Sequence, residues 1–410
     1  MEIQDLVIVG AGAAGCFAAA VVGQINPNLR IVLLEKTRQP LAKVRISGGG
    51  RCNVTHNCFD VSKLVANYPR GSDFLKGAFH RFQPQDMINW LESQGVVLKV
   101  EADGRMFPVS NSSATIIDCF LGLIKKQGVN LLLESEVIQL VSKSSYWELV
   151  LKNGQTLFSK KVLFTTGGVV KSYSIIEDLG HVMEKPLPSL FTFELQEEWI
   201  KKLTGSVIAS AEISIEGSRF TSTGPLLITH WGFSGPAILK LSAFAAKWLF
   251  DLNYQAVIHL NWTGEKKLIA VKETLLREKK GSPGKKILLC PLFSLSKNLW
   301  RAVLLEINPS LEDRVWARIS PKELDTLAEA LYRMPFKMIG KSTNKDEFVT
   351  CGGVSLDEIY PKTMESKKAG GIYFAGEVLN IDGVTGGFNF QNAWTSAWIA
   401  ANAIAQALSS

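Results

Sequence analysis

The chain has 410 residues, roughly two to three times the usual length of one domain. Hydrophobic residues make up 46 % and charged residues 20 % of it, which excludes a disordered, collagen-like or low-complexity protein. Lysine and arginine total 45 against 38 acidic residues, a net charge of +7. We therefore expect a folded protein of several domains, in which the distribution of the mild positive excess is more informative than its size.

The N-terminal segment predicts a βαβ unit of the kind that begins a doubly wound parallel sheet. Residues 5–9 and 31–35 have strand composition, and residues 13–23 have helical composition. The start of the chain shows no basic leader and no apolar run long enough to span a membrane. The six cysteines show no zinc-ligand spacing. These patterns predict a cytoplasmic protein with free thiols, no metal site and no membrane contact.

Four further segments are expected to continue the alternation of strands and helices: residues 96–100, 112–127, 130–134 and 137–141. Ser112 or Ser113 is the expected N-cap of the helix. The pattern then changes to short strands joined by polar turns. Asn153-Gly154, between two alternating segments, is the strongest short-range signal for a β-hairpin.

The second half of the chain predicts a β-rich insertion followed by a helical region. Hydrophobic residues alternate in three segments, residues 191–195, 207–215 and 226–229. Helical composition then predominates between residues 265 and 334, where Ser320-Pro321 resembles a helix start. A buried strand at 371–377 and an Ala-rich helix at 389–408 complete the expected elements.

The segment Gly10-Ala11-Gly12-Ala13-Ala14-Gly15 matches the dinucleotide-binding fingerprint directly after a strand and at the start of a helix. Its first glycine permits the tight turn, its second admits a pyrophosphate, and its third allows close packing of helix on strand. Glu35 ends the second strand, where a carboxylate would accept hydrogen bonds from ribose hydroxyls. The alternative interpretation is a glycine-rich turn that closes an ordinary βαβ unit.

Three further regions contain glycine clusters: residues 47–53, residues 165–168, and the C-terminal segments 376–377 and 385–389. The last of them precedes the terminal helix, whose N-terminus would face an anionic or carbonyl-rich ligand. A small NAD domain would not need the far end of the chain. A long flavin cofactor that touches both ends would need it.

These motifs together resemble the BaiN/RdsA-like NAD(P)/FAD-dependent oxidoreductases, a family that includes the aminoacetone oxidases. The resemblance rests on VIVGAGAAG, RISGGGRCNVTHN, TTGG, THWGFSGPA and GIYFAGEVLNIDGVTGGFNFQNAW, and it runs from the first strand to the last helix. It implies an α/β fold in three parts. These are a Rossmann-like FAD-binding domain of residues 1–188 and 340–410, an inserted β-rich substrate domain of residues 189–260 and 318–339, and a small helical insert of residues 261–317.

The resemblance also implies FAD contacts in four of these motifs, all but THWGFSGPA, and at Glu35, Lys36 and Val137. The expected cofactor-binding residues are Gly10, Gly12, Ala14, Gly15, Glu35, Lys36, Gly50, Arg51, Asn53, Val137, Thr166, Gly167, Gly376, Glu377, Asp382, Gly387, Phe388 and Asn389. Among them, Val137 would present backbone to the adenine and Asp382 would lie along the ribityl chain. In one departure from the family, the segment after Gly168 lacks a further glycine stretch that relatives carry, which bears on flavin affinity or on the shape of the substrate entrance.

A flavin performs hydride chemistry itself, so no separate catalytic base is required. Cys52 is a candidate proton donor, because the neighbouring Arg51 would stabilise its thiolate; the alternative is a small side chain that fills space. His230, beside Trp231, is a candidate for the substrate side of the flavin, and its alternative is a histidine packed in a core.

Three functions remain open. One is reduction of the uridine C5=C6 bond in ribosomal RNA, favoured slightly by charge. The second is a small-molecule oxidoreductase, either an amino ketone oxidase or an enone reductase, and the third is a non-catalytic flavin-binding protein. NAD(P)H is the expected transient donor, since a second dinucleotide fingerprint is absent. The basic residues expected to contact RNA are Lys266, Lys267, Lys279, Lys280, Lys285 and Lys286, with Arg70, Lys76, Arg81 and Arg105 as further exposed candidates.

Overall fold

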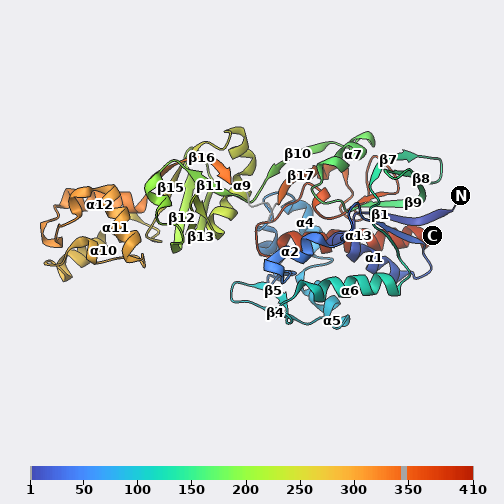
Figure 1. Ribbon diagram of the computed structural model, residues 1–410, viewed down its shortest axis with the longest axis horizontal. Helices are drawn as coiled ribbons and strands as arrows, with labels where there is room; N and C mark the ends of the chain where they lie inside the picture. The colour runs from blue at the N-terminus through green and yellow to red at the C-terminus, as the bar shows by residue number, and fades with distance from the viewer. Residues whose placement is uncertain (1, 343–348, 410) are drawn as a thin grey trace. The chain divides into compact units, whose positions relative to one another are not determined.

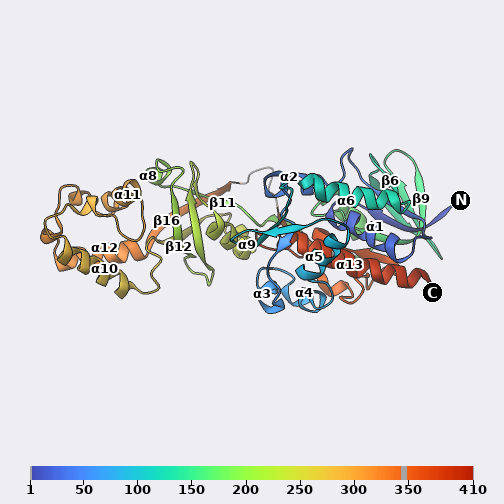
Figure 2. The same cartoon turned by 90° about the horizontal axis from the view of Figure 1, so that it is seen from below.

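The computed structural model describes residues 2–342 and 349–409 (Figures 1 and 2). The chain divides into two compact units. The first comprises Met1–Pro188 and Val349–Ser410, so it contains both chain ends, and the second comprises Ser189–Phe348. None of the helices in the described part of the chain is long and apolar enough to cross a membrane.

The first unit is built on a seven-stranded sheet of order β6-β2-β1-β9-β8-β7, in which β18 also pairs with β9. Strands β6, β2, β1, β9 and β18 are parallel to one another. Strands β8 and β7 continue the sheet beyond β9 in antiparallel pairing. Its central strand, β1, is buried at Leu6, Val7 and Ile8, as expected for a parallel strand covered on both faces. The strands are β1 (Ile3–Val9), β2 (Ile31–Leu34), β6 (Asn130–Leu132), β7 (Val137–Ser142), β8 (Trp147–Leu151), β9 (Thr156–Phe164) and β18 (Ile372–Phe374).

Three long helices of this unit confirm the expected pattern. Helix α1 (Ala13–Ile25) follows the glycine turn and packs against the C-terminal helix α13 (Phe388–Ser409) and against α6 (Ser113–Lys126). Ser112 caps α6, because its side chain accepts a hydrogen bond from the Ala114 N–H at 3.3 Å. The predicted hairpin at Asn153-Gly154 is the turn between β8 and β9.

Residues 96–100 do not continue the doubly wound alternation, which corrects the prediction. Strand β4 (Leu98–Val100) instead pairs antiparallel with β5 (Arg105–Pro108), which in turn pairs with β3 (Thr55–His56) in a separate sheet. The reason is the short connection between β4 and β5, since a parallel crossover needs about a dozen residues or more. The first unit also contains α2 (Ala42–Gly50), α3 (Val61–Val65), α4 (Ser72–Phe79), α5 (Pro84–Ser93), α7 (Tyr173–Asp178) and the antiparallel pair β10 (Met183–Pro188) and β17 (Thr350–Val354).

The second unit contains a closed barrel of order β11-β14-β13-β12-β15-β16. Its core includes Phe193, Ile213, Leu226, Ile258 and Phe336, one from each of five strands. The barrel was expected only as a β-rich region, and helix α9 (Pro236–Asp251), which packs on it, was not predicted. The barrel strands are β11 (Thr192–Leu195), β12 (Val207–Ile215), β13 (Thr221–Ile228), β14 (Gly232–Ser234), β15 (Ala256–Asn261) and β16 (Met334–Ser342), with α8 (Glu198–Lys201) beside them.

The helical insert lies between β15 and β16 in the chain and consists of α10 (Leu268–Gly281), α11 (Lys297–Ile307) and α12 (Pro321–Tyr332). Ser320 and Glu323 form a capping box at the start of α12, as expected from the sequence. Trp300 and Trp316 are fully buried within the insert. Strand β16 runs on to Ser342, so the predicted boundary at residue 340 falls inside it; the three-part functional division stays a prediction.

Candidate functional site

Gly12, in the turn between β1 and α1, and Gly15, in the first turn of α1, differ in what their surroundings allow. At Gly15 a Cβ would lie 1.9 Å from the carbonyl oxygen of Gly10, so a larger residue would push the helix away from the strand. At Gly12 the backbone has φ −82° and ψ −164°, which any residue can adopt. No protein atom lies within 4 Å of the position that a Gly12 Cβ would take. The protein itself therefore does not require glycine there, and the open space suits a ligand at the N-terminus of α1.

Glu35 is fixed at the end of β2 beside this turn. Its Oε2 accepts a hydrogen bond from the Ala11 N–H at 3.1 Å, and its Oε1 accepts from the Thr37 N–H at 3.0 Å and the Thr37 hydroxyl at 2.8 Å. The side chain is half-buried, and the neighbouring Lys36 is exposed. The carboxylate is thus held rigidly where the fingerprint expects a ribose acceptor.

Both ends of the chain meet around the glycine segments. The Thr55 hydroxyl donates to Gln391 Oε1 at 2.6 Å, and the Trp394 indole donates to the Val54 carbonyl at 2.9 Å, so the segment after residue 47 is tied to α13. A Cβ on Gly376 would lie 3.1 Å from that of Ala14. The structure therefore brings together motifs separated by more than 300 residues of sequence.

Two acidic residues of the C-terminal motif have partners within the protein. Lys43 Nζ lies 2.6 Å from Glu377 Oε2. Asp382 is fully buried, and both of its carboxylate oxygens accept hydrogen bonds from the Arg70 guanidinium. Arg70 was expected to be an exposed RNA contact, which is wrong, since its side chain is only 21 % exposed and pairs with Asp382. These pairs shape the loops, and direct FAD contacts of Glu377 and Asp382 stay predictions.

The segment before α13 is organised by side chains that fold back on it. Asn389 bridges Gly383 twice, accepting from its N–H at 2.7 Å and donating to its carbonyl at 2.8 Å. Phe388 stacks on His56, with ring centroids 4.7 Å apart, and His56 Nδ1 lies 3.0 Å from the Gly386 carbonyl oxygen. Sequence reasoning missed His56, although its place in RISGGGRCNVTHN was a signal. His56 joins two of the predicted cofactor motifs.

The proposed activation of Cys52 is not supported by its surroundings. The Arg51 guanidinium pairs with Glu101 at 2.5 Å and lies 4.0 Å from the centre of the Phe107 ring. Cys52 is fully buried, and this burial raises the pKa of its thiol to about 12. The thiol is therefore protonated at neutral pH, and the alternative of a space-filling side chain gains weight. A role as proton donor stays a prediction.

The remaining expected cofactor residues lie in the first unit. Gly50 has a positive φ of 82° with open space beside it, and Gly167 has a φ of 64°. Asn53 and Val137 are buried, whereas Thr166 is half-buried. Gly387, next to Phe388, has a φ of 94°. These positions are compatible with a cofactor cradle, and their individual contacts stay predictions.

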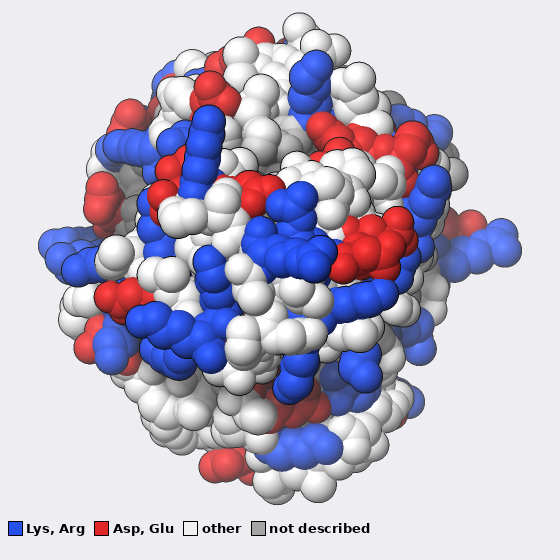
Figure 3. Space-filling model, turned by 90° about the vertical axis from the view of Figure 1, so that its left-hand side faces the viewer, with Lys and Arg blue, Asp and Glu red and all other residues white. Residues whose placement is uncertain are grey.

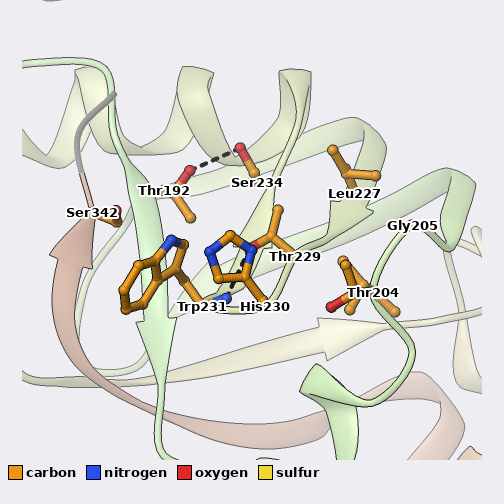
Figure 4. A pocket seen from close by; sticks show the side chains of 10 residues that line it. Thr192, Thr204, Gly205, Leu227, Thr229, His230, Trp231, Ser234 and Ser342 are labelled. Atoms are coloured by element: carbon orange, nitrogen blue, oxygen red, sulfur yellow. Dashed lines mark hydrogen bonds between the residues drawn. The ribbon is translucent and has the colours of Figure 1, made fainter. Parts of the chain in front are cut away.

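His230 lies in the second unit, where it lines a pocket of about 300 Å³ (Figure 4). It is exposed, so the alternative of a histidine packed in a core is wrong. Its ring lies 4.8 Å from that of Trp231, measured between centroids. Other lining residues carry hydroxyl groups: Thr192, Thr204, Thr229, Ser234 and Ser342.

The lysines of the helical insert fall into two groups. Lys279 Nζ donates to the Ile319 carbonyl at 2.7 Å, and Lys286 pairs with Asp313 at 2.7 Å. Figure 3 shows the end of the insert, where Lys and Arg side chains cover much of the face with acidic groups between them. Four lysines are exposed, and their side chains have no hydrogen-bond or ion-pair partner in the described part of the chain: Lys266, Lys267, Lys280 and Lys285.

Neither metal ligands nor disulfides occur among the described residues. No group of three or more His, Cys, Asp or Glu residues there could hold a metal ion. The six cysteines are all free thiols.

A model of the HI0933-like protein Rossmann domain matches residues 4–403 of the chain. The chain belongs to the HI0933-like family. The family resemblance expected from the glycine motifs is thereby confirmed, and so is the α/β fold class with a β-rich insertion.

This HI0933-like chain is similar to curated proteins along its whole length. It is 30 % identical over 422 residues to a ribosomal RNA dihydrouridine synthase of Escherichia coli strain K12, covering 100 % of both chains. It is 23 % identical to a 3-dehydro-bile acid delta(4,6)-reductase of Clostridium scindens, covering 97 % of this chain and 98 % of the relative.

Among solved structures, the HI0933-like chain resembles a 3-ketosteroid delta1-dehydrogenase from Sterolibacterium denitrificans. The TM-score is 0.52 at 13 % identity, and the match covers 99 % of this chain and 100 % of the other. At this identity the likeness shows a shared fold.

Proposed function

We propose that this chain is an FAD-dependent oxidoreductase that reduces uridine bases of ribosomal RNA, with NAD(P)H as the electron donor. The observation that carries the proposal is the 30 % identity to a ribosomal RNA dihydrouridine synthase across the whole of both chains. Such coverage leaves no domain of either protein unmatched. The local geometry of the first unit supports the cofactor, and the charge of the helical insert supports the substrate.

The residues of the first unit fit FAD. The open space at Gly12, directly at the N-terminus of α1, provides backbone N–H groups and a positive helix end for a pyrophosphate. Glu35, already fixed by Ala11 and Thr37, keeps lone pairs for ribose hydroxyls. When bound, FAD would supply hydride transfer. The protein would hold and orient it through the glycine segments that the two chain ends bring together.

The exposed lysines of the insert give the RNA substrate a second, independent support. A uridine in a stacked RNA must leave its stack to be reduced, so the protein must hold the surrounding backbone while one base enters the site. Lys266, Lys267, Lys280 and Lys285 are free to neutralise phosphates. Lys279 and Lys286 already have partners within the protein, so we expect them to contribute less to RNA binding.

A spectroscopic titration tests the proposed reaction. The purified protein, reconstituted with FAD, is mixed without oxygen with NADPH or NADH, and the flavin absorbance is followed. We expect bleaching, and then recovery on addition of ribosomal RNA that lacks dihydrouridine. Bleaching without recovery by RNA would contradict the RNA substrate, and the absence of bound flavin would contradict the enzyme.

A second candidate, an enone reductase acting on a small molecule, is favoured by the similarity to the bile acid reductase. It predicts recovery of the bleached flavin by a steroid with conjugated 4,6-double bonds and a 3-keto group. The same titration therefore separates the two substrates. Recovery by the steroid alone would favour this candidate.

A further inference from the structure

We propose that the pocket at the turn between β13 and β14 binds one unpaired RNA base stacked on Trp231. This inference rests on the proposed RNA substrate and assigns a second contact, away from the lysines of the insert. All lining residues of this pocket belong to the second unit, so the site is described within that unit alone.

The exposure of Trp231 is the first observation. Its side chain belongs to the largest residue type, yet 48 % of the residue remains exposed. Most large apolar residues of the barrel are instead buried in its core. An exposed aromatic ring beside a pocket offers a flat face to a ligand, and every nucleobase has a face that stacks on such a ring.

Hydrogen bonds fix the backbone around Trp231, so the fold itself holds the Trp231 side chain in its exposed position. The Trp231 carbonyl accepts from the Leu195 N–H at 3.0 Å, and the Trp231 N–H donates to the Thr229 hydroxyl at 3.3 Å. The Thr229 N–H also donates to the Gly232 carbonyl at 2.8 Å. A ring presented by a rigid turn loses little conformational freedom when a base stacks on it.

The polar groups of the pocket suit the edge of a base. The ring of His230 lies beside that of Trp231, as Figure 4 shows, and neither ring nitrogen of His230 has a hydrogen-bond partner in the described part of the chain. The Thr192 and Ser234 hydroxyls bind each other at 2.9 Å, which leaves acceptor capacity on both. Uracil, cytosine and the purines all present donors and acceptors along their edges, so one base would satisfy these groups.

Size and charge also favour a nucleotide. The pocket volume of about 300 Å³ is at the lower end of the range for small-ligand sites. Lys202, two residues before the lining residue Thr204, is exposed, and its side chain has no partner among the described residues. A cation at this place would neutralise a neighbouring phosphate. A paired duplex presents no base face, so the inference predicts a preference for single strands.

The test compares RNA binding by the unmodified protein and three variants. A fluorescein-labelled 12-nucleotide RNA without self-complementarity, and the same RNA annealed to its complement, are titrated and followed by fluorescence anisotropy. We expect Trp231→Ala to weaken single-strand binding by roughly 5- to 150-fold, the effect of losing one stacked base. Trp231→Phe should retain most of the affinity. Duplex binding should not change in either variant.

Ile339→Ala is the matched control, because Ile339 is 50 % exposed on the same barrel and does not line the pocket. It should bind single strands as the unmodified protein does. Equal single-strand affinity of Trp231→Ala and the unmodified protein would overturn the inference, and so would an equal loss of single-strand and duplex binding.

Dihydrouridine formation in ribosomal RNA, measured in parallel, separates this inference from the proposed function. Trp231-dependent binding of RNA without dihydrouridine formation would contradict the proposed reaction but support the base site. Dihydrouridine formation together with RNA binding that does not depend on Trp231 would contradict only the base site.

Discussion

Gly12 is the residue at which the structure argues most directly for a ligand, since neither backbone conformation nor a protein neighbour demands glycine there. We expect Gly12→Ala to fold normally and to weaken FAD binding by about 2 kcal/mol, a factor of about 30, because the methyl group would displace a charged phosphate from its N–H donors. Flavin absorbance after gel filtration, together with urea unfolding, measures both effects.

Two further glycine variants serve as comparisons for Gly12→Ala. Gly15→Ala should lower both stability and flavin binding, because its Cβ would lie 1.9 Å from the Gly10 carbonyl oxygen. Gly122→Ala, on the exposed side of α6 with no atom within 4 Å of its Cβ, should leave flavin binding unchanged. Full flavin retention by Gly12→Ala would mean that the open space holds no phosphate.

At the scale of elements, a buried histidine connects the start of β10 to the 3-10 helix η5 (Leu356–Glu358). His181 Nδ1 lies 2.9 Å from Glu358 Oε2, and its Nε2 lies 2.8 Å from the Ser366 hydroxyl. Burial lowers the pKa of His181 and outweighs the opposing effect of Glu358. The folded protein therefore takes up this proton at a lower pH than the unfolded chain does.

The sign of this shift makes the protein less stable in mild acid. Below the unfolded pKa of about 6.5, the unfolded chain binds a proton that the folded protein resists, so the free energy of unfolding falls as pH decreases. Urea unfolding at a series of pH values should show this decline, and His181→Gln should make it shallower. An identical slope in the variant would assign the decline to other groups.

Exposed lysines lie at the end of α10 and in the loop after it. Replacing Lys280 and Lys285 together by alanine should weaken ribosomal RNA binding. It should also lower the magnitude of the slope of log affinity against log salt by about 1 to 2, because a protein that makes fewer phosphate contacts releases fewer counterions on binding. The double variant of Lys125 and Lys126, exposed in the last turn of α6, removes the same charge from the first unit. If both double variants lose affinity equally, net charge explains the effect and the insert is not the docking surface.

For the whole molecule, local sequence signals predicted most elements but not their distant pairings. The strand, glycine turn and helix at the start of the chain, the cap at Ser112 and the hairpin at Asn153-Gly154 each depend on a few neighbouring residues, and all three are confirmed as structure. The strand at 96–100 has ordinary strand composition, so its composition alone did not reveal that it pairs in a separate antiparallel sheet. Helix α9 was missed because the alternating segments before it suggested continued β structure.

The candidate site shows the same limit. Glycine spacing indicates a cofactor cradle, because a tight turn imposes its demands locally. The pairing of Arg70 with Asp382 joins residues 312 positions apart, so no window of sequence could show that Arg70 is withdrawn from the surface. The exposure of His230 and Trp231 likewise depends on barrel closure, which brings β14 between β11 and β13.

Detection of the reaction product decides whether the chain reduces uridine. Ribosomal RNA lacking dihydrouridine is incubated with the FAD-loaded protein and NADPH or NADH, digested to nucleosides, and analysed by mass spectrometry. We expect uridine at a defined position to gain two hydrogens, and Gly12→Ala at limiting FAD to lose most of this activity. Unchanged uridine, in the presence of protein whose bound flavin is demonstrably reduced, would contradict the proposed reaction.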